Sequence, residues 1–385
     1  MIRLTGPWLT APETQRVCAM LEDGGHAAFV VGGCVRNELM GEPVGDVDIA
    51  TDAHPDRVIA LSSAAGLRPV PTGLDHGTVT VIADGTPFEV TTFRKDVQTD
   101  GRHAVVAFAT DIASDARRRD FTVNALYARR DGALSDPLGG LDDVMARRMR
   151  FIGDAETRIR EDYLRILRFF RFHAWYGNPD HGLDADGLAA CAVLADGIDT
   201  LSKERIGAEM RKLLAAPDPA PAIAAMRHAG VLRHALPGAS DAALSLLVHL
   251  ESANAMTPDP IRRLACLGGE AVATDLRLSR AEARAYADIR AAALGTAPAQ
   301  ELGYRLGPEK GRDAVVLRAA LLEQPVDLAQ LADITHGAQA IFPVKATDLM
   351  PDLSGPELGA RLKSLEEAWI ASGFALDRAA LLDRG

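Results

Sequence analysis

The pattern of apolar residues along the chain changes near Asp154. Before that point, short apolar or alternating runs predict strands separated by helices. After it, Leu, Ala and Arg recur with a helical period as far as the C-terminus. Breaks such as Pro217–Pro221 and Thr257–Pro260 divide this second part into several helices. The sequence therefore predicts an α/β head followed by a long all-α region.

The elements of the head follow from alternation and from turn residues. Asp84-Gly85-Thr86-Pro87 is a turn sequence, and the runs on either side of it alternate as in a β-hairpin. The predicted strands are Ala27–Val31, Val47–Thr51, Thr78–Ala83, Phe88–Phe93 and Val105–Phe108, and the predicted helices are Pro12–Asp23, Val35–Met40 and Pro55–Ala65.

Length and composition indicate an ordinary globular protein. The 385 residues suffice for two or more cores, and no apolar run approaches the length of a membrane span. The N-terminus lacks the apolar core of a signal peptide. Four scattered cysteines without a CxxC pair suggest neither a zinc site nor a disulfide framework. We therefore expect a cytoplasmic protein that does not bind membranes.

The charge of the chain is acidic overall but unevenly distributed. A formal net charge of −11 argues against a general coat for nucleic acids. RNA binding is still allowed, because counterion release depends on local basic surface and not on the total charge. Arginines scattered over solvated helix faces are the alternative. Three clusters in one third of the chain favour a polarised molecule: Arg117–Arg119, Arg147–Arg150 and Arg158–Arg171.

A glycine pair and two nearby aspartates form the first candidate site. The strand Ala27–Val31 leads into Gly32-Gly33, whose backbone N–H groups can hold a phosphate at the start of the next helix. Asp46 and Asp48 follow, and on a strand their side chains lie on one face. Adjacent carboxylates repel each other unless a cation lies between them, and oxygen ligands suit Mg²⁺. A turn or helix cap is the alternative, but the apolar neighbours of the two aspartates favour a strand. A phosphate-binding turn together with a metal-binding pair of carboxylates indicates nucleotidyl transfer.

Glu89 is the candidate for a third acidic group at this site. It lies on the predicted strand Phe88–Phe93, at a position that can point toward the two aspartates. A solvent-facing strand position is the alternative for this residue.

Two arginine-rich stretches are candidates for nucleotide contacts. Arg117-Arg118-Arg119-Asp120 precedes an apolar helix start, where planar guanidinium groups suit phosphate or ribose. Glu161–Phe172 is expected to be one mostly buried helix, on which Asp162 and Arg165 face the same way. Their carboxylate and guanidinium could read the edge of a base. A surface salt bridge between Glu161 and Arg165 is the alternative.

Arg168 and Arg171 continue the stripe that Arg165 begins on this predicted helix. Burying three arginines on an otherwise apolar helix costs free energy unless an anionic group pairs with them. This stripe therefore predicts an anionic partner beside the helix.

Together these stretches resemble the class II tRNA nucleotidyltransferases, which are the bacterial CCA-adding enzymes, and the related bacterial poly(A) polymerases. The resemblance covers most of the chain and is densest across 28–215. Each motif is weak alone, but their order and spacing are specific. The matching stretches are Gly32–Asp48 (GGxVRD, then DxD), His76–Val81, Phe88–Arg94, Asp100–His103, Arg118–Ala125, Glu161–Arg165 (EDxxR), Ser202–Leu214 and Gly355–Gly359.

The resemblance implies a fold and a set of roles. It implies a nucleotidyltransferase palm with a mixed β-sheet at 1–150, a helical neck that selects the nucleotide at 151–215, a helical body at 216–340 and a helical tail contacting tRNA at 341–385. Asp46 and Asp48 would bind Mg²⁺ and be catalytic together with Glu89. The nucleotide-binding residues would be Gly32, Gly33, Arg36, Arg119, Asp162, Arg165, Arg168 and Arg171.

The implied reaction adds C, C and A from CTP and ATP to the 3′ end of tRNA without a nucleic-acid template, releasing pyrophosphate. Poly(A) addition is the first alternative, but His76–Val79 replaces the Gly-Arg-Arg-Phe signature and no basic extension follows Leu381–Gly385. C-only or A-only addition and a non-catalytic RNA-binding protein are further alternatives. The sequence leaves the oligomeric state open.

Two positions depart from the family pattern. Asn37 stands where the family usually has Asp, which keeps a hydrogen-bonding group but removes a charge partner for Arg36. Ala346 stands where glycine is common, in the region expected to contact tRNA.

Overall fold

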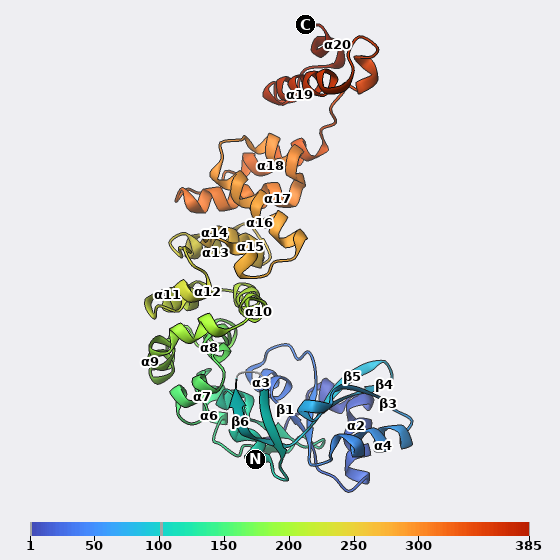
Figure 1. The fold of residues 1–385 in the computed structure, drawn as a ribbon, viewed down its shortest axis with the longest axis vertical. Helices are drawn as coiled ribbons and strands as arrows, with labels where there is room; N and C mark the ends of the chain where they lie inside the picture. Colours follow the sequence, from blue (N-terminus) through green and yellow to red (C-terminus); the bar gives the residue numbers. More distant parts are fainter. Residues whose placement is uncertain (1, 101–102, 385) are drawn as a thin grey trace. The chain divides into compact units, whose positions relative to one another are not determined.

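The computed structural model describes residues 2–100 and 103–384. It contains two compact units, one formed by residues up to 213 with 222–235, the other by 214–221 with 236–385. Figure 1 shows the sheets and their helices at the N-terminal end of the chain and only helices after them. The predicted fold class, an α/β head followed by an all-α region, is therefore confirmed.

The head contains a seven-stranded mixed sheet with the order β3-β4-β5-β2-β1-β8-β9 and a separate two-stranded sheet, β6-β7. In the large sheet β2 and β5 run parallel, and every other neighbouring pair is antiparallel. The strands are β1 (Ala28–Val31), β2 (Asp48–Thr51), β3 (Arg68–Gly73), β4 (Thr78–Ala83), β5 (Thr86–Thr92), β6 (Arg94–Asp100), β7 (His103–Phe108), β8 (Tyr127–Ala128) and β9 (Leu134–Ser135).

All predicted strands and helices of the head are present, with ends that differ by two residues at most. Asp84 and Gly85 both have positive φ, 48° and 89°, as the tight turn of a two-residue hairpin requires. The strand therefore starts at Thr86, earlier than predicted. The unpredicted strands are short or polar, and β3 carries prolines at an exposed edge. Of the predicted motif Asp100–His103, residues 101–102 lie outside the described residues.

One face of the central strands is apolar and covered, and the other is polar. Val79, Val81 and Ala83 of β4 are fully buried, and helices α2 (Pro12–Asp23) and α4 (Pro55–Ala64) pack against β4 and β5. Thr78 and Thr80 alternate with these residues on β4, and Thr80 lies opposite Glu89 of β5. The polar face of the sheet therefore carries the candidate carboxylates.

Aromatic packing joins the head to helix α8 (Leu164–Tyr176). Phe121 of the head lies 5.2 Å from Phe172 of α8, and Phe151 stacks on Phe169 at 5.5 Å between ring centroids. These rings form a buried contact within the first unit. As a result, α8 has a fixed position relative to the sheet.

The remaining elements are mostly helical. They are α1 (Pro7–Thr10), α3 (Gly33–Met40), α5 (Ile112–Arg117), α6 (Leu141–Met145), α7 (Ala155–Glu161), α9 (Ala185–Val193), α10 (Lys203–Leu214), α11 (Ala220–His228), α12 (Leu232–Ala235), α13 (Leu244–Ala253), α14 (Pro260–Leu267), α15 (Val272–Asp275), α16 (Arg280–Leu294), α17 (Ala299–Leu321), α18 (Leu328–Gln339), α19 (Gly355–Ala371) and α20 (Arg378–Leu382), with 3₁₀ turns η1 (Leu74–His76), η2 (Thr122–Asn124), η3 (Ala195–Thr200) and η4 (Ala346–Asp348). Within residues 2–100 and 103–384, no helix is long and apolar enough to cross a membrane.

A buried ion-pair network stabilises the second unit. Glu251 of α13 is 2% exposed and accepts from Arg262 Nε at 2.7 Å and Arg263 Nε at 2.9 Å, both on α14. Arg263 also donates to the backbone carbonyls of residues 214, 216 and 217. Arg262 also donates to Asp313 Oδ1 at 2.6 Å, so Glu251 and Asp313 together compensate the two buried guanidinium groups.

Replacing Glu251 by glutamine is expected to lower the free energy of unfolding by about 3 to 5 kcal/mol, because it removes the counter-charge of buried Arg263 and leaves buried Arg262 with Asp313 alone. Denaturant titration would measure the loss. Glu367→Gln is the matched control, since Glu367 forms only an exposed pair with Lys363 and should change stability by less than about 0.5 kcal/mol. Equal effects of the two substitutions would contradict the stabilising role of Glu251.

Candidate active site

Asp48, Glu89 and Asp46 approach one another on the polar face of the sheet. Asp48 is the first residue of β2 and is in register with Glu89 on the parallel strand β5. Asp46 lies in the loop just before β2, so of the two aspartates only Asp48 belongs to the strand. Buried Val47 separates the two more accessible aspartates, which keeps the expected alternation.

The environment of Asp48 favours a bound cation. Burial, the carboxylate of Glu89 and that of Asp46 raise the pKa of Asp48 to about 6, and Arg119 only partly opposes them. Across the described parts of the chain, no three His, Cys, Asp or Glu side chains form a complete metal site by themselves. Two carboxylates are nevertheless enough for Mg²⁺, which often completes its shell with water and substrate phosphates. The donor set therefore fits such an ion.

The glycine pair lies beside an arginine. Gly32 has φ 77°, a conformation that glycine adopts readily, and α3 begins at Gly33. A Cβ atom at Gly32 would lie 3.4 Å from Nη1 of Arg119. Arg119 also acts electrostatically on Asp48. The turn, the guanidinium and the carboxylates thus lie near one another.

Asp115 fixes the position of Arg119. This carboxylate is 1% exposed and accepts from Arg119 Nη2 at 3.1 Å, from Arg118 Nε at 2.8 Å and from the Tyr127 hydroxyl at 2.7 Å. Sequence reasoning missed Asp115. Its spacing of three and four residues from two arginines was a detectable signal.

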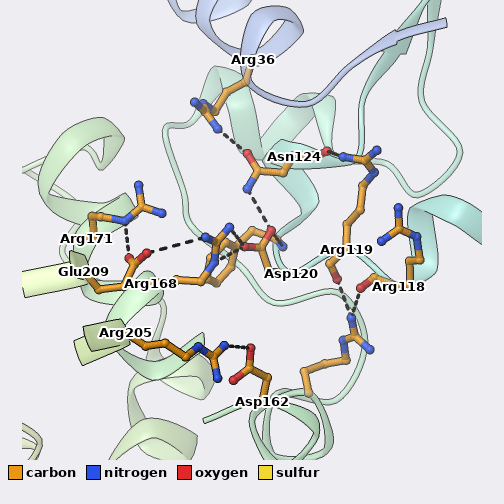
Figure 2. A network of polar contacts seen from close by, with 12 residues as sticks. Arg36, Arg118, Arg119, Asp120, Asn124, Asp162, Arg168, Arg171, Arg205 and Glu209 are labelled. Atoms are coloured by element: carbon orange, nitrogen blue, oxygen red, sulfur yellow. Dashed lines mark hydrogen bonds and ion pairs between the residues drawn. The ribbon is translucent and has the colours of Figure 1, made fainter. Parts of the chain in front are cut away.

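Arg36 contacts the protein on all sides. It is 5% exposed, its guanidinium lies 4.1 Å from the Tyr176 ring and 5.2 Å from the Phe172 ring of α8, and it donates to Asn124 Oδ1. Figure 2 shows this last contact as the start of a chain of polar side chains. In this structure Arg36 connects α3 to α8.

The side-chain amide of Asn37 forms hydrogen bonds through both its oxygen and its nitrogen. Its Oδ1 accepts from Nε and Nη2 of Arg36 at 3.1 and 2.8 Å, and its Nδ2 donates to the carbonyl of Pro43 at 2.7 Å. Pro43 lies in the loop that leads to Asp46. A neutral side chain therefore takes the place of the usual carboxylate and also ties down this loop.

The expected single helix over Glu161–Phe172 is wrong, because the chain breaks between α7 and α8. Asp162 is extended, with φ −157°, and its Oδ1 accepts from the backbone N–H of Leu164, which starts α8. Its Oδ2 accepts from Arg205 of α10 at 2.7 Å. Arg165 pairs with Glu161 at 2.5 Å, as the alternative interpretation predicted. This pair is mostly buried, not a surface contact.

Carboxylates of the protein meet the other two arginines of α8. Asp120 Oδ2 accepts from Arg168 Nε at 2.8 Å, and Glu209 Oε2 of α10 accepts from Arg171 Nε at 2.5 Å. Figure 2 shows these pairs continuing the chain from Arg36 through Asn124 and Asp120. The anionic partner that the arginine stripe predicted is thus supplied, at least in part, by the protein itself.

Replacing Asp48 by asparagine is expected to raise the Tm of the metal-free protein at pH 8. Because the pKa of Asp48 is raised from 3.8 to about 6 on folding, the folded state binds more protons than the unfolded state within that range. Stability is therefore lost as the pH rises through it. An uncharged Asn avoids this loss.

Thermal unfolding in EDTA at several pH values measures the effect, and the gain should shrink toward pH 5. Asp23→Asn, at an exposed position at the end of α2, is the control and should give no such pH-dependent gain. A lower Tm of Asp48→Asn at pH 8 would show that the carboxylate is not destabilising.

Two family models match the chain. Residues 28–150 match the "Poly A polymerase head domain", and residues 183–243 match the "Probable RNA and SrmB-binding site of polymerase A". The first match covers the candidate carboxylates and the glycine pair. The second covers α9 to α12.

Known relatives match either nearly the whole chain or somewhat more than half of it. Human CCA tRNA nucleotidyltransferase 1, mitochondrial, is 33% identical over 379 residues, which cover 93% of this chain and 86% of the human protein. The CCA-adding enzyme of Geobacillus thermodenitrificans is 39% identical over 227 residues, 58% of this chain and 54% of that enzyme.

Among solved structures, the CCA-adding enzyme of Bacillus stearothermophilus in complex with CTP has a TM-score of 0.77 at 28% identity, covering 96% of this chain and 94% of that one. The fold, the sequence and the arrangement of the motifs all indicate the same family. The chain belongs to the class II family of CCA-adding enzymes and poly(A) polymerases.

Proposed function

We propose that this chain adds C, C and A, taken from CTP and ATP, to the 3′ end of tRNA, without a nucleic-acid template and with release of pyrophosphate. The observation that carries the proposal is the carboxylate group Asp46, Asp48 and Glu89 beside the Gly32 turn and Arg119. The names of the relatives support the product, since the human and Geobacillus proteins are a CCA tRNA nucleotidyltransferase and a CCA-adding enzyme.

The reaction is attack of the RNA 3′-hydroxyl on the α-phosphate of the nucleotide. Enzymes of this family generally need a divalent metal, and we propose that Asp46 and Asp48 hold Mg²⁺. When bound, the ion neutralises phosphate charge and makes the hydroxyl a better nucleophile. The N–H groups after Gly32 and the guanidinium of Arg119 would orient the triphosphate.

Asp162 and Arg165 are the proposed selectors of the base. Arg205 and the Leu164 N–H hold the Asp162 carboxylate, and Glu161 holds the Arg165 guanidinium. Both side chains are therefore oriented before a nucleotide binds, and each retains hydrogen-bonding capacity for a base edge. We infer that Arg205 acts as a positioning residue for this selection.

Arg36, Arg168 and Arg171 have a different part in the proposal. Their guanidinium groups already contact Asn124, Asp120 and Glu209. A nucleotide phosphate would have to share them with these partners. We therefore propose that Arg36 and Arg168 mainly fix α8 against the head, that Arg171 fixes α8 against α10, and that all three contribute positive charge near the nucleotide.

The RNA would contact basic surface outside the head. Besides Arg205, which pairs with Asp162, residues 203–243 of the second matched region carry the basic residues Lys203, Arg211, Lys212, Arg227 and Arg233. We propose that this part and the tail contact tRNA.

We also propose a cytoplasmic location. Because the human and mouse relatives are named mitochondrial, cell fractionation is the test of this location.

Product length tests the reaction. Incubation with tRNA lacking its 3′ end and with CTP, ATP or both should extend the tRNA by two residues with CTP alone and by the full CCA with both. Asp48→Ala should lower the rate by about 10³-fold, because several kcal/mol of charge stabilisation are lost, whereas Asp23→Ala should leave it unchanged. Long A tails would reassign the chain to poly(A) addition, and addition of C alone or A alone to a partial activity.

Nucleotide competition tests the selectors. Asp162→Ala and Arg165→Ala should each lower the preference for CTP over UTP by about 10- to 100-fold, the discrimination that a bidentate base contact gives. Arg205→Gln should lower it less and leave the KM for tRNA unchanged. Arg160→Gln is the control, because Arg160 is exposed and pairs only with Glu156. An unchanged CTP preference in Asp162→Ala would refute the selecting role.

A further inference from the structure

One row of residues crosses the sheet face that carries the candidate carboxylates. Val31 of β1 is in register with Asp48 of β2, Asp48 with Glu89 of β5, and Glu89 with Thr80 of β4. The next residue after Val31 is Gly32, where the glycine turn begins. Neighbouring strands of a sheet lie about 5 Å apart. The row therefore leads in even steps from the glycine turn, past the carboxylates, to Thr80.

The direction of attack determines which end of this row the RNA approaches, and this step rests on the proposed function. The 3′-hydroxyl attacks in line with the departing pyrophosphate, so the two lie on opposite sides of the α-phosphorus. The Gly32 turn and Arg119, the proposed triphosphate contacts, lie at the β1 end of the row. The terminal ribose of the RNA must therefore approach from the other end, over Glu89 and Thr80.

Thr80 and Thr72 present hydroxyl groups at this end of the row. Oγ1 of Thr80 lies 2.7 Å from Oγ1 of Thr72 on β3, so one hydroxyl donates to the other. Each hydroxyl has one proton and two lone pairs, and this contact uses only one of the two protons. Thr72 is exposed and Thr80 is half-buried, so a ligand can reach the pair.

The 2′-hydroxyl is the group of an RNA end that such a pair can recognise. It is attached to the carbon next to the one that carries the attacking 3′-hydroxyl, and it can both donate and accept a hydrogen bond. When the 3′-hydroxyl lies at the carboxylates, its neighbour can extend toward β4. There Thr80 faces Glu89 at about 5 Å between Cβ atoms. A DNA end lacks this hydroxyl.

We propose that Thr80, whose hydroxyl Thr72 orients, binds the 2′-hydroxyl of the terminal ribose of the acceptor. This contact makes the chain extend an RNA end in preference to a DNA end. It adds to the proposed function a residue that selects the acceptor, whereas Asp162 and Arg165 select the incoming nucleotide.

Two tRNAs that lack the CCA end are the probes, one ending in a ribonucleotide and the other in a 2′-deoxynucleotide. The measured quantity is the ratio of their rates of first C addition from CTP in a single turnover. Thr80→Val keeps the shape of the side chain and removes its hydroxyl. It should lower the ratio about fivefold, the effect of one neutral hydrogen bond, by slowing only the ribose-ended tRNA. Thr80→Ser keeps the hydroxyl and should keep the ratio.

Thr78→Val is the matched control. Thr78 lies on the same face of β4 and pairs with Thr91 of β5 at 3.0 Å, so its loss also removes one member of a hydroxyl pair. Thr91, however, is in register with Ala50 and not with a carboxylate. Thr78→Val should therefore leave the ratio of the two rates unchanged.

The outcomes separate this inference from the proposed function. An unchanged ratio in Thr80→Val, equal slowing of both tRNAs, or an equal fall of the ratio in Thr78→Val would overturn the role of Thr80 and leave the proposed function standing. Long A tails made by the wild-type chain would refute the proposed product alone, and the ratio would then be measured with ATP. A wild-type chain that extends neither tRNA would refute both.

Discussion

The ion pair between Asp120 and Arg168 connects the two parts of the candidate site. Asp120 follows the arginine run of the head, and Arg168 lies on α8, 48 residues later. Although burial alone would raise the pKa of Asp120, the Arg168 guanidinium and the Asn124 amide hold it well below its usual range. The carboxylate is thus charged at any physiological pH. Through it, the glycine turn and the carboxylates keep a fixed position relative to α8.

The candidate site also contains neighbouring carboxylates whose mutual repulsion lowers the stability of the fold. The sheet places Asp48 and Glu89 side by side because β2 and β5 are parallel and in register. Helices α2 and α4 cover the other face of the sheet, and on the polar face Asp48 is half-buried while Glu89 beside it is exposed. The same arrangement that costs stability in the free protein creates the demand for a cation. Under the proposed function, Asp48 would therefore lower the stability of the free protein while serving activity.

Much of the head can be predicted from sequence because its signals are local. The Asp84-Gly85 turn sets the hairpin register, and the carboxylates follow by alternation along β2 and β5. The break between α7 and α8 could not be predicted, since a helical pattern continues across Asp162 and the break rests on its own side chain accepting the Leu164 N–H. The partner Arg205 lies 43 residues from Asp162. Such contacts depend on how helices pack, which no local pattern reports.

The neutral amide of Asn37 changes the electrostatics around Arg36. A carboxylate there would cancel most of the charge of Arg36, whereas Asn37 accepts its hydrogen bonds and leaves the charge in place. Nη2 of Arg36 would lie 3.8 Å from a Cβ at Gly33. Compared with a relative carrying Asp, this chain keeps one more positive charge at the Gly32 turn, where we propose that phosphate binds. Because that charge is buried, mobile salt ions screen it less than a surface charge.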